Sequence, residues 1–359
     1  MKSLVFSDFD LDFLNEFQNM NNSRDLMLFI LNLKDYTLKY IKGMVDFTNR
    51  NWLVKRINDY MIYSGKMVRS SFFYIFLLGM VCDLKRYWDQ NFWDKVFKLG
   101  AIFELAHSAT LVHDDILDGA KKRRGKPAVH IKFGIDGALI FGDILIISVL
   151  NKSYEVDPLY SKLLMEALEN MCFGEVLQYQ NKYNVYLEDE EYFEILYLKT
   201  GVLFAAISVI AYHLGCRYTT TSFDNDTARV IYDLFSKYGV AFQIVDDVLD
   251  YFQDEKILKK DSNNDLLSGR ITYPLILLMK DFKNKSRFKN LWLKNPSYFS
   301  KVVTTEIRKR KDLLENSIKK SEEFLDLKYL DIISEKIGMK DIFRDSLRFF
   351  VNSLVYRNY

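Results

Sequence analysis

Hydrophobic residues recur along most of the chain at the three-to-four-residue spacing of amphipathic helices. Near the N-terminus, Asp25 marks the start of one such run, which contains Leu26, Phe29, Ile30, Leu33, Tyr36, Tyr40 and Ile41. Longer apolar runs follow at Trp93 to Val112, Phe141 to Leu150, Val202 to Ile210 and Val240 to Val245. Only 4 prolines and 15 glycines interrupt 359 residues, which favours long helices over a turn-rich β fold. The pattern predicts an all-α protein.

The chain shows no internal repeat, low-complexity linker or clear domain boundary. We therefore expect one domain over residues 1–359, with a motif-bearing core at about 60–275. Residues 276–359 are predicted to form charged C-terminal helices without a catalytic pattern.

Two acidic motifs with the pattern Asp-Asp-x-x-Asp stand at the ends of apolar runs. Their aspartates are Asp114, Asp115 and Asp118 in the first motif and Asp246, Asp247 and Asp250 in the second. On a helix the first and last aspartate share a face, where like charges repel by about 0.2–0.5 kcal/mol. A single motif of this kind could equally be a solvated helix face, but two copies beside apolar runs favour a bound cation. Carboxylates with room for water and phosphate oxygens suit Mg²⁺.

Cationic residues precede and follow the first acidic motif. Lys66 and Arg69 follow Gly65 and are three residues apart, so on a helix both face one way. They could bind a phosphate, although read alone they could also be surface cations. The basic loop that contains Arg123 and Arg124 comes directly after the motif, where guanidinium groups would match phosphate oxygens.

Three further polar residues stand in apolar helical surroundings. His107 lies two turns before Asp114 and shares its face, although a histidine on an apolar face can equally be a core residue. Lys199 precedes an apolar run, where burial without an anionic partner would be costly. Gln243 lies on the same face as Asp246.

Composition narrows the function classes. Lys and Arg total 50 and Asp and Glu total 48, so no bulk charge points to a nucleic-acid partner. The three cysteines form no metal-binding pattern, which is typical of a reduced cytoplasmic protein. The run from Phe72 to Cys82 is too short to span a bilayer, so we expect no stable membrane insertion.

Taken in order, these stretches resemble the trans-prenyl diphosphate synthases, which condense isopentenyl diphosphate with an allylic diphosphate. The matching residues are Gly65-Lys66-x-x-Arg69, His107, both acidic motifs, Arg123-Arg124-Gly125, Gly142-Asp143, Glu175-x-x-Gln178, Lys199-Thr200-Gly201, Phe242-Gln243, Asp265-Leu266 and Gly269-Arg270-x-Thr272-x-Pro274. The resemblance departs at Met67 and Ser70, which replace a commonly basic residue and a common proline, and at Arg270, which replaces a lysine. The loop at 259–263 also lacks the usual glycines.

The resemblance implies a helical bundle of the isoprenoid-synthase type around a deep central cavity, with the acidic motifs facing each other across its mouth. It also implies about three Mg²⁺ ions per site and a homodimer. The isopentenyl diphosphate would be bound by Lys66, Arg69, His107 and Arg124. The allylic diphosphate would be bound by Arg123, Lys199 and Arg270. Thr200 and Gln243 would line the path of the developing cation and, together with Lys199, are the candidate catalytic residues.

Two other functions remain open. A terpene cyclase also uses acidic motifs on helices, but it needs no isopentenyl site such as Lys66, Arg69 and His107. A non-catalytic subunit of a heteromeric synthase usually loses its aspartates, and this chain keeps all six.

Product length is predicted from the positions five and four before Asp114, which are Ala109 and Thr110. By resemblance, short-chain synthases commonly place Phe or Tyr there. The small side chain of Ala109 predicts that a growing prenyl tail passes to a deeper floor such as Phe103, about three turns from the metals. We expect a medium-to-long polyprenyl product, with farnesyl or geranylgeranyl diphosphate as the alternative.

Overall fold

The computed structural model describes residues 23–45, 51–61, 65, 67–81, 90–252 and 264–355. In this part the chain is almost entirely helical, which confirms the predicted fold class. The helices of the first half are α2 (Ser23–Met44), α3 (Trp52–Tyr60), α4 (Val68–Val81), α5 (Gln90–Leu117), α6 (Val129–Phe133), α7 (Ile135–Val156) and α8 (Pro158–Gln180). Those of the second half are α9 (Asp189–Leu196), η3 (Tyr197–Gly201), α10 (Val202–Cys216), α11 (Asn225–Phe252), α13 (Asn264–Ser268), α14 (Tyr273–Lys280), α15 (Lys285–Lys294), α16 (Pro296–Lys309), α17 (Lys311–Glu323), α18 (Leu327–Lys336) and α19 (Asp341–Val355).

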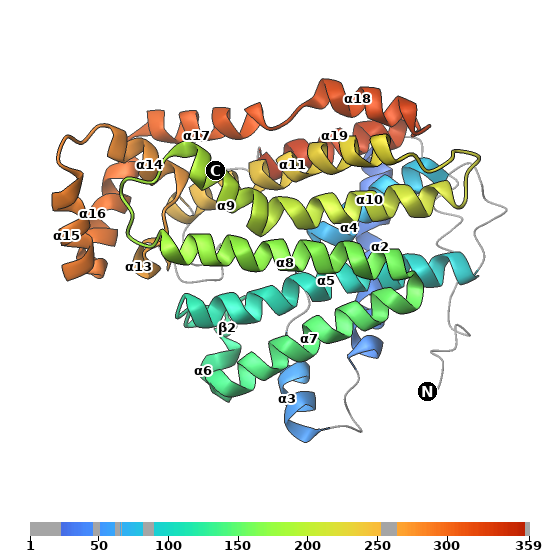
Figure 1. Ribbon diagram of the computed structural model, residues 1–359, viewed down its shortest axis with the longest axis horizontal. Coiled ribbons are helices and arrows are strands. Elements are labelled where there is room, and N and C mark those ends of the chain that lie inside the picture. The colour runs from blue at the N-terminus through green and yellow to red at the C-terminus, as the bar shows by residue number, and fades with distance from the viewer. Residues whose placement is uncertain are drawn as a thin grey trace.

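The long helices α5, α7, α8, α10 and α11 run along the length of the molecule (Figure 1). In the core, α4 packs against α10, and α10 lies between α8 and α11. All residues of α4 after Val68 are buried, as expected for a helix that is apolar all round. Its Phe72 ring contacts the rings of Phe204 and Phe235 at centroid distances of 5.6 and 5.0 Å.

Helices α9, η3 and α10 form one continuous helix from Asp189 to Cys216, so the apolar run from Val202 to Ile210 belongs to a longer helix that begins well before Lys199. By length and composition this helix could cross a membrane. However, 83% of its most apolar window is buried inside the bundle, which is typical of the core helix of a globular domain.

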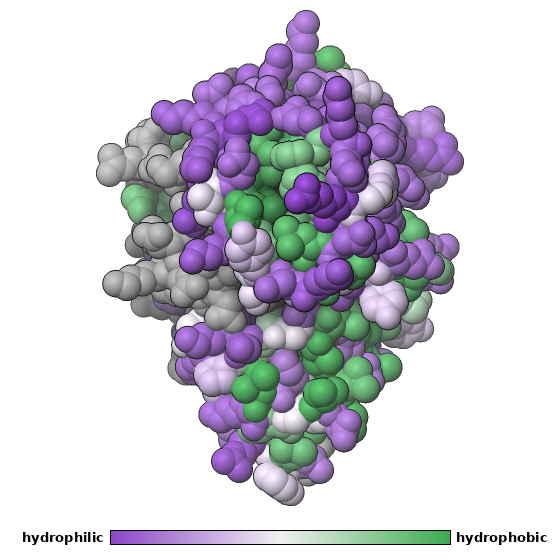
Figure 2. Space-filling view, turned by 90° about the vertical axis from the view of Figure 1, so that its left-hand side faces the viewer, coloured by the Kyte–Doolittle hydropathy of each residue, from purple (hydrophilic) through white to green (hydrophobic). Residues whose placement is uncertain are grey.

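Both acidic motifs lie near the C-terminal ends of their helices, α5 and α11, at the left end of the bundle in Figure 1. Figure 2 views this end directly, where hydrophilic side chains surround exposed hydrophobic ones. The first motif is followed by a small hairpin of β1 (Lys122–Arg123) and β2 (Lys126–Pro127).

The C-terminal helices α15 and α16 hold the segments beside the second motif. The buried Trp292 indole on α15 donates a hydrogen bond to the Leu266 carbonyl oxygen at 2.7 Å. On α16, Arg308 Nε donates to the carbonyl oxygen of Tyr251 at the C-terminal end of α11. These contacts anchor the segment that carries Asp265 and Arg270.

Candidate active site

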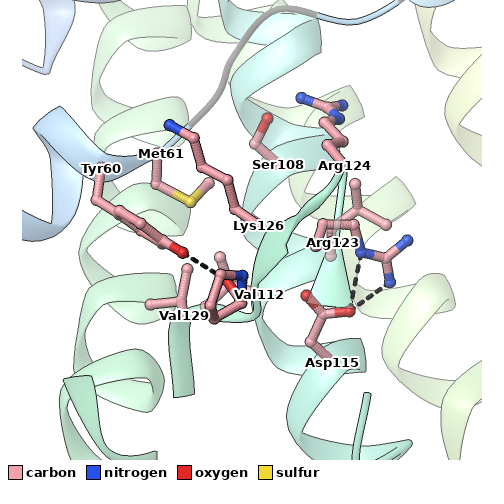
Figure 3. A pocket seen from close by; sticks show the side chains of 11 residues that line it. Tyr60, Met61, Ser108, Val112, Asp115, Arg123, Arg124, Lys126 and Val129 are labelled. Carbon is pink, nitrogen blue, oxygen red and sulfur yellow. Dashed lines mark hydrogen bonds and ion pairs between the residues drawn. The ribbon is translucent and has the colours of Figure 1, made fainter. Parts of the chain in front are cut away.

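Two aspartates of the first motif are held by arginines, one from the hairpin that follows the motif and one from a distant segment. Asp115 is 3% exposed, and its Oδ1 accepts hydrogen bonds from Nε of Arg123, at 2.9 Å, and from Nη2 (Figure 3). Asp118 forms an ion pair with Arg270, which lies after α13. Burial raises the pKa of Asp118 to about 6, although the Arg270 charge opposes the shift. Burial also raises the pKa of Asp114, against the charges of Lys199, Arg270 and Arg123.

In the second motif, Asp247 is bonded to α9 and, through Gln243, is linked to η3. Asp247 Oδ2 accepts a hydrogen bond from the Tyr192 hydroxyl at 2.7 Å, and Oδ1 accepts one from Gln243 Nε2 at 3.1 Å. The Gln243 carbonyl oxygen in turn accepts from the Thr200 hydroxyl at 3.0 Å. Burial, followed by the negative charge of Asp265, raises the pKa of Asp247 to about 7. Asp250 is also buried, with 2% exposure.

Arg270 lies between the first motif and Asp265. Its guanidinium pairs with Asp118 of the first motif and lies 3.6 Å from Asp265, whose charge raises the pKa of Asp247 in the second. Arg270 also lies 4.0 Å from Glu175. The structure therefore brings the two predicted acidic motifs to one end of the bundle (Figure 1), where Arg270 pairs with the first motif and with Asp265.

Lys199 is partly buried near these carboxylates. Burial of its charge calls for an anionic partner, and the structure supplies one. Its ammonium group donates to the Glu175 carboxylate and to the side-chain amide oxygen of Gln178, both on α8. Lys199 and Thr200 belong to η3, a π-helical turn, and such turns are frequent at functional sites. The π turn presents Lys199 to α8 while Thr200 faces Gln243 on α11.

Two glycines allow η3 and α11 to approach backbone to backbone. A Cβ added to Gly239 would lie 2.7 Å from the Gly201 Cα, and one added to Gly201 would lie 2.7 Å from the Ser236 carbonyl oxygen. Neither position can therefore carry a side chain without moving a helix. This approach sets the Thr200–Gln243 hydrogen bond.

The residues predicted to bind isopentenyl diphosphate lie together where the structure describes them. Arg69 is 8% exposed and stacks over the Phe204 ring at 5.6 Å. Burial lowers its pKa to about 10. Burial, together with the positive charges of Arg69 and Arg124, lowers the pKa of His107 well below its usual range. Lys66 lies outside the described residues, as does the loop at 259–263.

The hairpin turn explains how Arg124 reaches this cluster. Arg124 and Gly125 form the two-residue loop between β1 and β2, with φ angles of 53° and 80°. Two positive φ angles are required by a type I′ turn, which glycine adopts readily and arginine rarely. Here the turn directs Arg124 toward Gly65. A Cβ added to Gly65 would lie 3.1 Å from the guanidinium group of Arg124.

A pocket of about 40 Å³ opens beside this hairpin (Figure 3). Its lining includes Tyr60, Ser108, Arg123 and Arg124. The Tyr60 hydroxyl donates to the Pro127 carbonyl oxygen at 2.7 Å, which fastens α3 to the hairpin. The pocket is far smaller than the roughly 150 Å³ that admits a benzene ring, so it is not the channel for a prenyl tail.

The predicted chain-length residues lie on α5, one turn before the first motif. Ala109 is fully buried in the main hydrophobic cluster, and Thr110 is half-buried with its hydroxyl bonded to the His107 carbonyl oxygen at 2.9 Å. Phe103 is also fully buried and packs edge-on against Phe73 at 5.1 Å. Their effect on product length stays a prediction.

The carboxylates at this end fit a hard divalent cation. Asp118 Oδ1 is buried and has no hydrogen-bond partner among the described residues. In the same part of the chain, no three His, Cys, Asp or Glu side chains converge closely enough to hold a metal, and arginines pair with Asp115 and Asp118. The donors are nevertheless all carboxylate oxygens, the type that Mg²⁺ prefers.

Sequence reasoning missed Tyr192, Gly239 and Glu104. The buried Glu104 carboxylate accepts hydrogen bonds from the Ser70 N–H and hydroxyl. Glu104 had a signal, because it is an isolated acidic residue within the apolar run of α5. Tyr192 lies in an acidic stretch that gives no sign of its contact with Asp247, and the role of Gly239 depends on the approach of another helix.

Comparison with known proteins identifies the family. The family model for polyprenyl synthetase matches residues 50–305, most of the chain. Component 2 of heptaprenyl diphosphate synthase from Bacillus subtilis is 29% identical over 262 residues, which cover 73% of this chain and 71% of the relative. The short chain isoprenyl diphosphate synthase of Methanocaldococcus jannaschii is 31% identical, with 63% of this chain and 67% of the relative covered.

Among solved structures, heptaprenyl diphosphate synthase from Staphylococcus aureus has a TM-score of 0.74 and 26% identity, covering 92% of this chain and 99% of that one. A polyprenyl synthase from Caulobacter crescentus, solved with calcium and isoprenyl diphosphate, has a TM-score of 0.76 and 23% identity, covering 92% and 97%. The fold is that of prenyl-transferring enzymes. This chain belongs to the polyprenyl synthetase family.

Proposed function

We propose that this enzyme condenses isopentenyl diphosphate with an allylic diphosphate and releases a linear polyprenyl diphosphate. The observation that carries the proposal is the arrangement of two aspartate motifs and Arg270 at one end of the bundle (Figure 1), next to a separate cluster of Arg69, His107 and Arg124. One end of the bundle thus offers places for two diphosphates. A terpene cyclase would need only one.

The mechanism follows from these charges. Asp114, Asp118 and Asp246 would hold Mg²⁺, which when bound supplies positive charge for the leaving diphosphate. Arg270 and Lys199 stabilise the same negative charge as the allylic C–O bond breaks. The double bond of isopentenyl diphosphate then forms the new C–C bond, and a proton passes to the released diphosphate. The Thr200 hydroxyl and the Gln243 amide lie beside the path of the cation, in a buried region that limits quenching by water.

The test is a turnover assay with radiolabelled isopentenyl diphosphate and the geranyl, farnesyl and geranylgeranyl primers, with and without Mg²⁺. Chain elongation that disappears when the metal is chelated supports the proposal. Conversion of an allylic diphosphate to a cyclic hydrocarbon without incorporation of label would favour a cyclase. No turnover by a folded protein would favour a subunit that needs a partner; the Bacillus subtilis relative is named as one component of its synthase.

We further propose a medium-to-long product, because Ala109 places only a methyl group one turn before the aspartates of the first motif. Replacing Ala109 with Phe or Tyr should shorten the product markedly, since an aromatic ring there would block the growing tail. Product chromatography measures the effect, and Ala109→Ser serves as the control that keeps the side chain small. An unchanged product length from an active Ala109→Phe enzyme would place the floor of the channel nearer the metals.

The predicted homodimer also has a candidate surface, on which a second copy would cover the exposed apolar residues of α7 and α8. These residues are Ile140, Ile147, Tyr154, Val176 and Tyr179, each at least half exposed. The two helices pack side by side, so the residues form one surface that could pair with itself about a two-fold axis.

An Ile147→Asp substitution should therefore convert the dimer to monomers, because a charge would be buried at the contact. Light scattering after size-exclusion chromatography reports the molar mass. Leu293→Asp is the control, because Leu293 on α15 is similarly exposed, at 52%. A dimer that persists in the Ile147→Asp variant would show that the interface does not lie on α7 and α8.

A further inference from the structure

We propose that Glu104 is a positioning residue for the isopentenyl diphosphate site: its buried carboxylate, bonded to Ser70, fixes α4 against α5 and holds Arg69 and Arg124 ready for the diphosphate. The inference rests on the proposed function, which assigns that cationic cluster to isopentenyl diphosphate. It adds a residue that contacts no substrate itself.

The geometry begins at the N-terminus of α4. Ser70 is the third residue of this helix, so its N–H has no acceptor within the helix. The residue before the helix, Met67, has a φ of 47°, and its thioether is only a weak hydrogen-bond acceptor, unlike the side chains that usually cap a helix. Glu104 on α5 supplies the acceptor instead. Its Oε1 lies 2.9 Å from the Ser70 N and 3.0 Å from the Ser70 hydroxyl.

Both partners are buried, with 6% exposure for Glu104 and none for Ser70. Hydrogen bonds to a charged acceptor are shorter and stronger than those between neutral groups. The bonds therefore fix Ser70, and Arg69 is its neighbour in the first turn of α4. Glu104 lies one turn before His107 on α5. Its carboxylate therefore joins α5, which carries His107, to α4, which carries Arg69.

Electrostatics give Glu104 a second role. The charges of Arg69 and Arg124 oppose each other: Arg124 lowers the pKa of Arg69. For each arginine, Glu104 is the strongest of the charges that raise the pKa. A fixed anion beneath the cluster thus offsets the repulsion between two guanidinium groups before substrate arrives, so that less reorganisation accompanies binding.

This role predicts a change in affinity opposite in direction to the change that counting charges would predict. Removal of one negative charge near an anion site should tighten binding if Coulomb attraction alone decides the affinity. If Glu104 positions the arginines, its loss should weaken binding, because they would separate when the substrate is absent.

The experiment measures the Kd of isopentenyl diphosphate by calorimetry without an allylic partner, so that no reaction occurs. Glu104→Gln keeps an acceptor for Ser70 but removes the charge. We expect the Kd to rise about tenfold, which corresponds to about 1.4 kcal/mol, while the KM for the allylic diphosphate changes less than twofold. An unchanged or lower Kd overturns the proposal, as does an equal loss for both substrates.

Ser70→Ala is a second variant that decides the question if Glu104→Gln does not fold. It removes the hydroxyl and keeps the N–H, so a Kd about threefold higher is expected, and an unchanged Kd overturns the proposal. Ser317→Ala is the matched control, because Ser317 on α17 is equally buried and its hydroxyl bonds only within its own helix, to the Leu313 carbonyl oxygen.

Arg124→Ala separates this inference from the proposed function. If Arg124→Ala weakens isopentenyl diphosphate binding and Glu104→Gln does not, only the positioning role fails. If Arg124→Ala also leaves the Kd unchanged, the cluster does not bind this substrate and the two-site assignment fails with it.

Discussion

Replacing Asp114 or Asp246 with alanine should lower turnover by roughly a hundredfold to a thousandfold, the usual cost of losing one preorganised contact with developing charge. Each residue opens an acidic motif, and Asp114 lies within reach of the charges of Lys199, Arg270 and Arg123. Saturating Mg²⁺ should not restore the rate, because the donor oxygen itself is missing. Steady-state assays with both substrates measure the loss.

The same variants should remain folded without metal. Burial raises the pKa of Asp114, which means that the folded protein tolerates its charged form poorly. Thermal unfolding in EDTA should therefore show no loss of stability for Asp114→Ala. Asp233→Asn is a suitable control, because Asp233 lies on α11 with the second motif but is exposed. Near-normal turnover by either alanine variant would refute the metal-binding assignment.

Gly239→Ala should lower activity by about a hundredfold, the typical result of a misplacement of about 1 Å in an active site. The new methyl group would meet the backbone of Gly201, which cannot rotate away, so η3 must move from α11. That movement would break the hydrogen bond between Thr200 and Gln243 and shift Lys199. Overpacking of this kind also costs about 1–3 kcal/mol, which a thermal unfolding scan should detect.

Gly215→Ala provides the matched control for this substitution. Gly215 is buried on α10, but its added Cβ would meet the flexible end of the Met80 side chain rather than a backbone. We expect near-normal turnover from Gly215→Ala. Equal losses in both variants would show that the effect is general packing rather than the position of η3.

The helical fold and the chemistry of the two motifs could be predicted from the sequence because both depend on local spacing. The i, i+4 relation of Asp114 and Asp118 and the apolar run before them require only that a helix form. Likewise, Lys199 beside an apolar run called for an anion, and Glu175 supplies it.

The rest depended on how the helices approach one another. The bond between Tyr192 and Asp247 joins two helices, and the Ser70–Glu104 pair joins two others. The assignment of Asp115 to metal binding stays a prediction, although the structure occupies its Oδ1 with Arg123. Spacing along a helix gives the direction of a side chain but does not identify its partner on another element.

The contacts of α15 and α16 bear on how activity could be lost within this family. A shortened chain that ends before Trp292 would retain every motif by which the enzyme is recognised. It would lack the indole that anchors Leu266 and the guanidinium that caps α11, so Asp265 and Arg270 would lose their support. Intact motifs are therefore an incomplete criterion for function in truncated or spliced sequences, because part of the catalytic geometry is encoded in a C-terminal segment that contains no motif.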